Sequence, residues 1–186
     1  MLSAQDKESK KKEFEEIAFQ HMDSLYGAAL RMTRDGSDAQ DLVQDTYIRA
    51  FRFFDKFEKG TNFKAWLFKI LKNVYINKYR KELKKPQMVN IADVEASGDL
   101  KEEVTPEDEI FNGLLDDDIT RAMDDLPEEF RLAIILSDLQ GLSYKEVAEI
   151  LDRPIGTVMS RLHRGRKLLR SSLRDYAKKH GYIKDL

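Results

Sequence analysis

The middle of the chain, residues 86–114, carries few apolar residues and shows no hydrophobic period. It also contains Pro86, Gly98 and Pro106, which interrupt regular secondary structure. On both sides of this segment apolar residues recur at helical spacing, and no segment alternates as a β-strand would. The chain has 186 residues, so each side has room only for a small domain. The sequence therefore predicts an all-α fold, with two small helical domains joined by a flexible linker.

The same patterns set the expected domain boundaries. In chain order we expect a lysine-rich mobile tail, a helical domain, the linker, a second helical domain and a short tail, over residues 1–12, 13–85, 86–114, 115–180 and 181–186. Between residues 93 and 129 there are 15 acids and two bases, which gives a net charge of −13. The linker is therefore predicted to be acidic.

Composition excludes several kinds of protein. The chain has no cysteine, which excludes disulfides and thiolate metal sites. Its N-terminus has no apolar leader, and no stretch approaches the ~20 apolar residues of a membrane span. We therefore expect a cytoplasmic protein with no membrane insertion. We also expect no cofactor and no metal site, since only three histidines are present and none is paired at ligand spacing.

The last third of the chain has the pattern of a helix-turn-helix. Ser143 and Glu146 form a capping box that opens a short helix, and Asp152–Pro154 form a tight turn. A long helix is then expected from Ile155 to Lys179. Its apolar face includes Gly165, which predicts a close approach of the first helix of the motif.

The opposite side and the flanks of this long helix carry polar and basic groups: Thr157, Ser160, Arg161, His163, Arg164, Arg166 and Lys167. Residues 142–186 hold 11 Lys or Arg and five acids. Basic side chains neutralise phosphates, and arginine can also read guanine. The pattern favours duplex DNA binding over a merely solvated basic face.

The third helix of the N-terminal domain, from Phe63 to about Lys85, is also basic. Residues 62–85 contain eight Lys or Arg and one acid. Opposite an apolar stripe (Phe63, Leu67, Ile70, Leu71 and Val74) lie Trp66, Lys69, Lys72, Asn73, Ile76, Tyr79 and Arg80. Aromatic, amide and cationic groups together suit single-stranded nucleic acid. A partly buried Trp66 beside solvated lysines is the alternative, and the residues alone do not decide between the two.

The second helix is expected to begin at a capping box, Ser37–Gln40, and to carry a different outer face. That face holds Asp41, Gln44, Asp45 and Ile48. The acids would repel DNA, and an apolar Ile48 pointing away from the core suggests a protein partner. A solvated acidic face remains the alternative.

Several segments resemble the sigma-70 family, and specifically its extracytoplasmic-function (ECF) sigma factors. Residues 38–46 (DAQDLVQDT) resemble the polymerase-binding helix of region 2.2, and residues 61–73 resemble regions 2.3 and 2.4. Residues 126–131 (LPEEFR), 141–148 (GLSYKEVA) and 154–166 resemble region 4. The sequences of these motifs most resemble those of the redox-stress branch of actinobacterial sigma factors.

The resemblance implies a role for each surface. Core RNA polymerase would dock on Asp41, Gln44, Asp45 and Ile48 through the clamp helices of its largest subunit. The melted −10 element would be read by Asn73, with Lys69, Lys72 and Arg80 on the backbone and Trp66, Ile76, Thr61 and Asn62 nearby. The duplex −35 element would be read by Thr157, Ser160, His163, Arg164 and Arg166, with Arg161 and Lys167 beside them. An anti-sigma factor is a further expected partner, and no catalysis is expected.

Two other functions compete with this interpretation. A helix-turn-helix regulator with a helical sensor domain would bind its operator without polymerase, but it would have no use for the basic and aromatic third helix. An all-α enzyme is disfavoured because the sequence shows no Ser/His/Asp set and no phosphate-binding glycine loop.

Overall fold

The computed structural model describes residues 4–82 and 117–182 of the chain. These residues form helices and the turns between them, and this part of the chain contains no strand. The predicted all-α fold is confirmed. The expected linker, residues 86–114, lies outside the described residues, as do residues 183–186 of the expected C-terminal tail.

The N-terminal domain is built from α1 (Ala4–Ala18), α2 (Met22–Thr33), α3 (Gly36–Arg52) and α4 (Phe63–Glu82). α2 and α4 pack on α3, and the aromatic ring of Phe14 joins α1 to the same core. The predicted apolar stripe of α4 lies in this core, where Leu67, Leu71 and Val74 are fully buried.

The expected tail at residues 1–12 differs from the structure, because α1 begins at Ala4. Its lysines, glutamates and alanines are good helix formers and continue the helix that Phe14 anchors. Lys10 pairs with Asp55, and Lys59 pairs with Glu13, so the helix is also tied to the residues that follow α3.

The start of α3 is also different from the prediction. Asp35, and not Ser37, is the N-cap, and its carboxylate accepts a hydrogen bond of 2.7 Å from the backbone N–H of Asp38. Asp35 can take this role because α2 ends at Thr33 and Arg34 adopts a left-handed conformation with φ of 65°. The expected capping box at Ser37–Gln40 is therefore wrong.

The C-terminal domain contains α6 (Asp117–Asp124), α7 (Glu128–Ile134), a π-helical turn (Ile135–Leu139), α8 (Tyr144–Leu151), α9 (Ile155–Ser172) and α10 (Arg174–Lys179). The predicted capping box of α8 is confirmed, since Ser143 and Glu146 exchange both bonds. The predicted single helix to Lys179 is instead broken at Leu173, which separates α9 from α10.

α9 packs mainly against α7, and it also contacts α8. Gly165 marks the closest approach. A Cβ atom placed there would lie 2.7 Å from Cδ1 of Ile134 and 3.1 Å from Cβ of Phe130, both in α7. The close approach is therefore made by α7, and the prediction that the first helix of the motif makes it is wrong.

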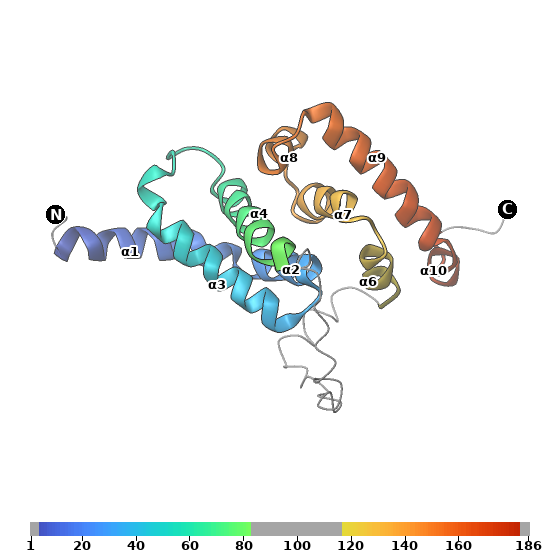
Figure 1. The fold of residues 1–186 in the computed structure, drawn as a ribbon, viewed down its shortest axis with the longest axis horizontal. Coiled ribbons are helices and arrows are strands. Elements are labelled where there is room, and N and C mark those ends of the chain that lie inside the picture. The colour runs from blue at the N-terminus through green and yellow to red at the C-terminus, as the bar shows by residue number, and fades with distance from the viewer. Residues whose placement is uncertain (1–3, 83–116, 183–186) are drawn as a thin grey trace, which may run out of the picture.

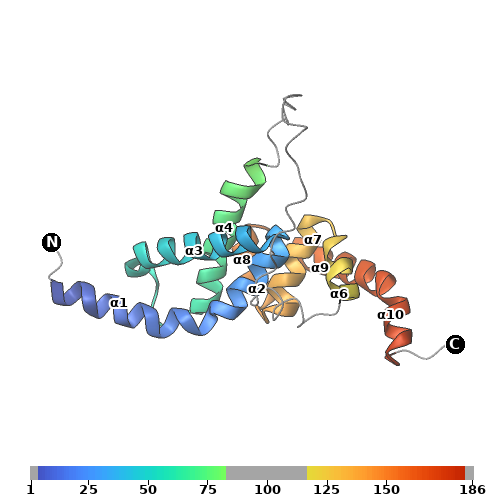
Figure 2. The ribbon, with the colours of Figure 1, turned by 90° about the horizontal axis from the view of Figure 1, so that it is seen from below.

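The two domains lie against each other, with α4 next to α8 (Figures 1 and 2). Buried apolar residues of both domains form one continuous cluster. Among the described residues, no helix is long and apolar enough to cross a membrane.

Candidate nucleic-acid interface

α9 has one buried side and one side open to solvent. Val158, Leu162 and Gly165 are buried against the domain, while the predicted duplex contacts Ser160, His163, Arg164 and Lys167 are all exposed. Thr157 is half-buried at the start of the helix, and its carbonyl accepts a 2.9 Å bond from the Ser160 hydroxyl. The open side is polar and basic, as a helix that enters the major groove of DNA requires.

Two of the predicted duplex contacts are held by acids of the same domain. Arg166 binds Asp138 in a bidentate pair, with Nε and Nη2 2.9 and 2.6 Å from the two carboxylate oxygens. Arg161 donates from Nη2 to Glu129 at 2.6 Å. The structure therefore separates these two arginines from the five remaining residues of the predicted set.

α4 has three distinct sides. The first packs on α2 and α3 through the predicted stripe, and the second faces the C-terminal domain. Phe68 and Tyr75 belong to this second side, and both are buried. The third side, between them, carries Lys69 and Asn73, which are exposed.

Two of the predicted single-strand contacts, Lys69 and Asn73, lie on this exposed side, and Lys72 and Ile76 lie beside them. Asn73 Oδ1 accepts a 3.0 Å bond from Lys72 Nζ, and Ile76 is half-buried beside them. Burial lowers the pKa of Lys72, since it lies at the edge of the contact with the C-terminal domain. The side chain of Arg80 lies outside the described residues.

Trp66 is half-buried, because its ring packs against those of Phe57 and Phe63. The centroid of the Trp66 ring lies 5.3 Å from that of Phe57 and 5.5 Å from that of Phe63. The structure thus favours the alternative that Trp66 is partly core. A half-buried indole still leaves part of its surface for a base.

The loop before α4 contacts the other domain. Thr61 is exposed, and its hydroxyl donates to the carbonyl of Glu58 at 2.7 Å. Asn62 Oδ1 accepts from the backbone N–H of Ala65 at 3.3 Å, and its Nδ2 donates to Glu146 at 2.6 Å. A predicted −10 residue is therefore bonded to the capping box of the helix-turn-helix. The hydrogen bonds from Ser143 and Asn62 lower the pKa of Glu146 and keep its carboxylate ionised.

Further polar contacts join α4 to the C-terminal domain. Lys64 Nζ donates to the carbonyl of Gln140 at 2.7 Å and lies over the ring of Phe68. The Tyr75 hydroxyl is hydrogen-bonded to Glu128 and Arg131, and burial raises the pKa of Tyr75. These contacts surround the buried Phe68, which lies between Lys64 and Tyr75 by helical spacing.

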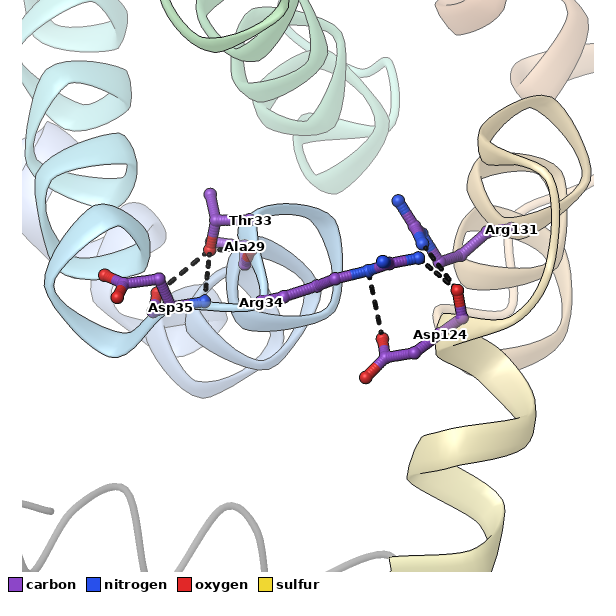
Figure 3. Close-up of polar contacts among 6 residues, drawn as sticks. All are labelled: Ala29, Thr33, Arg34, Asp35, Asp124 and Arg131. Carbon is purple, nitrogen blue, oxygen red and sulfur yellow. Dashed lines mark hydrogen bonds and ion pairs between the residues drawn. The ribbon is translucent and has the colours of Figure 1, made fainter. Parts of the chain in front are cut away.

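A second contact between the domains lies at the end of α2 (Figure 3). Arg34 reaches across to Asp124, where it meets both the backbone carbonyl and, at 3.4 Å, the carboxylate. Arg131 donates to the same carbonyl at 3.3 Å from within its own domain. Asp124 belongs to the acidic stretch 93–129, so an acid of that stretch binds a base of the N-terminal domain.

The outer face of α3 is exposed where the sequence predicts a partner surface. Asp41 and Gln44 are exposed, Asp45 is half-buried, and Ile48 is 61% exposed. An apolar side chain so open to solvent is consistent with a surface that another protein covers.

Comparison with known proteins assigns the two domains. Residues 19–84 match the family description "Sigma-70 region 2", and residues 116–169 match "Sigma-70, region 4". The chain belongs to the sigma-70 family, in its ECF group. It is 37% identical to the ECF RNA polymerase sigma factor SigE of Mycolicibacterium smegmatis over 167 residues, which are 90% of this chain and 62% of the relative. It is 35% identical to ECF sigma factor SigW of Bacillus subtilis over 169 residues, 87% of this chain and 89% of the relative.

A solved structure agrees with this assignment. The sigma factor RpoE of Bartonella quintana, in complex with the anti-sigma factor NepR, matches with a TM-score of 0.67 and 30% identity, over 88% of this chain and 98% of that one. The chain of CnrH, solved with the cytosolic domain of CnrY, has the same fold, with a TM-score of 0.63 and 24% identity.

Sequence reasoning missed some exposed aromatic residues of this sigma factor. Phe51, in the last turn of α3, and Phe53, directly after the helix, are 38% and 42% exposed. Phe51 packs on Phe14, and Lys10 lies over its ring. Phe51 lies three residues after Ile48, and this helical spacing could have shown that it borders the same outer face.

Proposed function

We propose that this chain is an alternative sigma factor that binds core RNA polymerase and directs initiation at particular promoters, in a stress response. Polymerase docks on the outer face of α3, the melted −10 strand lies along the exposed side of α4, and the duplex −35 element lies against the open side of α9. The protein itself catalyses no reaction. Promoter DNA and polymerase are thus its partners.

One observation carries this proposal: the chain holds two separate basic helices with different chemistry. α9 has an open side with Arg164 and Lys167, which suits a duplex groove. α4 has exposed Lys69 and Asn73 near a half-buried Trp66, which suits an unpaired strand. A helix-turn-helix regulator needs only the first, and its operator binding would not use α4 or the outer face of α3.

The docked domains imply a step before promoter binding. The two promoter elements lie about two DNA turns apart, roughly 70 Å. A linker of thirty extended residues reaches up to ~100 Å. Contact between α4 and α8 holds the two readers much closer than the elements are. The domains therefore separate when both elements are bound, and the bond between Asn62 and Glu146 breaks.

An anti-sigma factor is a further proposed partner, supported by the similar sigma factor that was solved with one. The redox-stress branch remains part of the proposal. Because the chain has no cysteine, a thiol sensor for such a stress would lie on the partner.

The decisive experiment is run-off transcription with core polymerase on a library of promoters. We expect initiation that depends on this chain, and loss of it when Ile48→Asp blocks docking. With holoenzyme, Asn73→Ala should lower open-complex formation on duplex templates and leave the −35 contact intact, and Arg164→Ala should weaken the −35 contact. Tight sequence-specific duplex binding without polymerase, together with no initiation, would instead identify a regulator.

A further inference from the structure

Arg161 and Arg166 occupy the two flanks of α9. At about 100° per residue, they lie on opposite sides of the buried stripe formed by Val158, Leu162 and Gly165. Each flank meets a different part of the domain. Arg161 faces Glu129 in the first turn of α7, and Arg166 faces Asp138 in the π-helical turn.

The guanidinium of Arg166 is held by three bonds from two elements. Besides the bidentate pair with Asp138, its Nη1 donates to the Tyr144 hydroxyl at 3.2 Å, and the group lies over the Tyr144 ring. The hydrogen bond to Asp138, with that to Tyr144, raises the pKa of Arg166, so the guanidinium stays charged. Arg166 thus joins α9 to the π-helical turn and to the first turn of α8.

The π-helical turn is what presents Asp138. Its wider turn closes with a bond of 3.0 Å from the backbone N–H of Gln140 to the carbonyl of Ile135. An inserted residue of this kind redirects the side chains that follow it. The carboxylate of Asp138 is thereby placed in line with the guanidinium fork, where two parallel bonds fix the geometry as well as the charge.

We propose that Arg161 and Arg166 are positioning residues, which fix the rotation of α9 about its own axis relative to α7 and α8. Both opposing flanks are tied, so a rotation that relaxes one pair strains the other. Reading of duplex DNA then falls to Thr157, Ser160, His163, Arg164 and Lys167. This inference rests on the proposed duplex recognition by α9.

The competing possibility is that the arginines leave their acids and bind phosphates in the complex. That exchange would leave the carboxylates of Asp138 and Glu129 unpaired beside the negative DNA backbone, which disfavours it. The two possibilities predict different salt dependence, because each lost phosphate contact lowers the slope of log K against log salt by about 0.9.

The first test measures binding of the full chain to a fluorescent duplex of mixed sequence, about 30 base pairs long, over a range of low salt concentrations. Arg166→Gln should leave the salt slope unchanged. The matched control, Arg164→Gln, should lower the slope by about one unit. An equal decrease for both variants would overturn the inference and leave the duplex function in place. An unchanged slope for both would instead contradict duplex recognition by α9.

The second test measures orientation. With a duplex selected from a randomised pool by the full chain, Arg166→Gln and Asp138→Asn should each lower the preference for the selected over the mixed duplex roughly fivefold, and together no further. A reversed pair, Asp138→Arg with Arg166→Asp, should recover part of the preference. Loss of preference only in the Arg166 variants, with Asp138→Asn unchanged, would overturn the inference. Urea unfolding of each variant separates lost orientation from lost folding.

Discussion

The two helices proposed to bind nucleic acid, α4 and α9, are held in different ways. α9 is buried along one stripe and leaves its basic side open, while α4 is buried on two sides and keeps only a narrow exposed strip between them. The second buried side of α4 is covered by the other domain. The proposed duplex-binding side of α9 is therefore accessible while the two domains are in contact, whereas the proposed single-strand side of α4 has the C-terminal domain at its edge.

If α4 binds the −10 strand as proposed, this difference couples that contact to the position of the other domain. Asn62 and Lys72 both lie at the contact with α8, so their surroundings change when the domains separate. No equivalent contact involves the open side of α9 in the described residues. Separation should therefore affect single-strand recognition more than duplex recognition.

The largest effect is expected from Phe68→Ala. Phe68 is fully buried on the side of α4 that faces the C-terminal domain, and truncation of such a residue costs about 3–5 kcal/mol. We expect a lower free energy of unfolding in urea and a larger distance between the domains. Because the chain has no cysteine, dyes on Gln20→Cys and Ser171→Cys, both at exposed positions, can report that distance.

Val74→Ala is the matched control, since Val74 is 1% exposed but lies in the predicted stripe on α2 and α3. It should lower stability and leave the distance between the dyes unchanged. An unchanged distance between the dyes in Phe68→Ala as well would contradict the claim that the C-terminal domain holds the second side of α4.

The next effect concerns how α9 is held. Gly165→Ala forces a Cβ against Ile134 and Phe130, and overpacking of this kind costs about 1–3 kcal/mol. Gly156→Ala in the same helix is the control, since a Cβ there meets nothing within 4 Å. Urea unfolding should show a clear loss for the first and none for the second. Equal stability of the two variants would mean that close packing against α7 does not determine the position of α9.

A smaller effect is expected at the contact shown in Figure 3. Asp124→Asn removes the ion pair with Arg34, and pairs this exposed contribute about 0.2–1 kcal/mol. The dye distance should lengthen slightly at low salt and less so at high salt, where the pair is already screened. Arg121→Gln is the control, because its pair with Asp118 lies within α6. A shift of the same size in both variants would argue against a specific contact between the domains.

The contrast between the two helices also explains which of their buried residues could be predicted from the sequence. The stripe of α9 has a single period, so the buried positions Val158, Leu162 and Gly165 could be predicted from the residues alone. The same period also predicts burial of Ile155, which is 49% exposed at the start of the helix. On α4, Phe68 and Tyr75 were not recognised as buried, because a second apolar side weakens the period that identifies the first. Their burial depends on a partner domain that is distant in sequence.

The same limit applies to single charged residues. Arg161 and Arg166 have the residue type and the position of DNA contacts, and only the placement of Glu129 and Asp138 shows that they are engaged. The N-cap of α3 was misplaced for a local reason, since a left-handed Arg34 could not be foreseen from its side chain.

The smallest effect is expected from pH, at the junction of α4 with the rest of its domain. His21 stacks on Phe63 with ring centroids 6.0 Å apart, and burial, with the nearby charge of Lys64, lowers the pKa of His21. The folded state therefore binds fewer protons than the unfolded state. Stability should fall as the pH drops through the ordinary histidine pKa of about 6.5. Urea unfolding of the wild-type chain and of His21→Gln across this range should show a dependence that the variant loses in part. An identical pH dependence in both would mean that protonation of His21 does not weaken the packing of α4 against the rest of its domain.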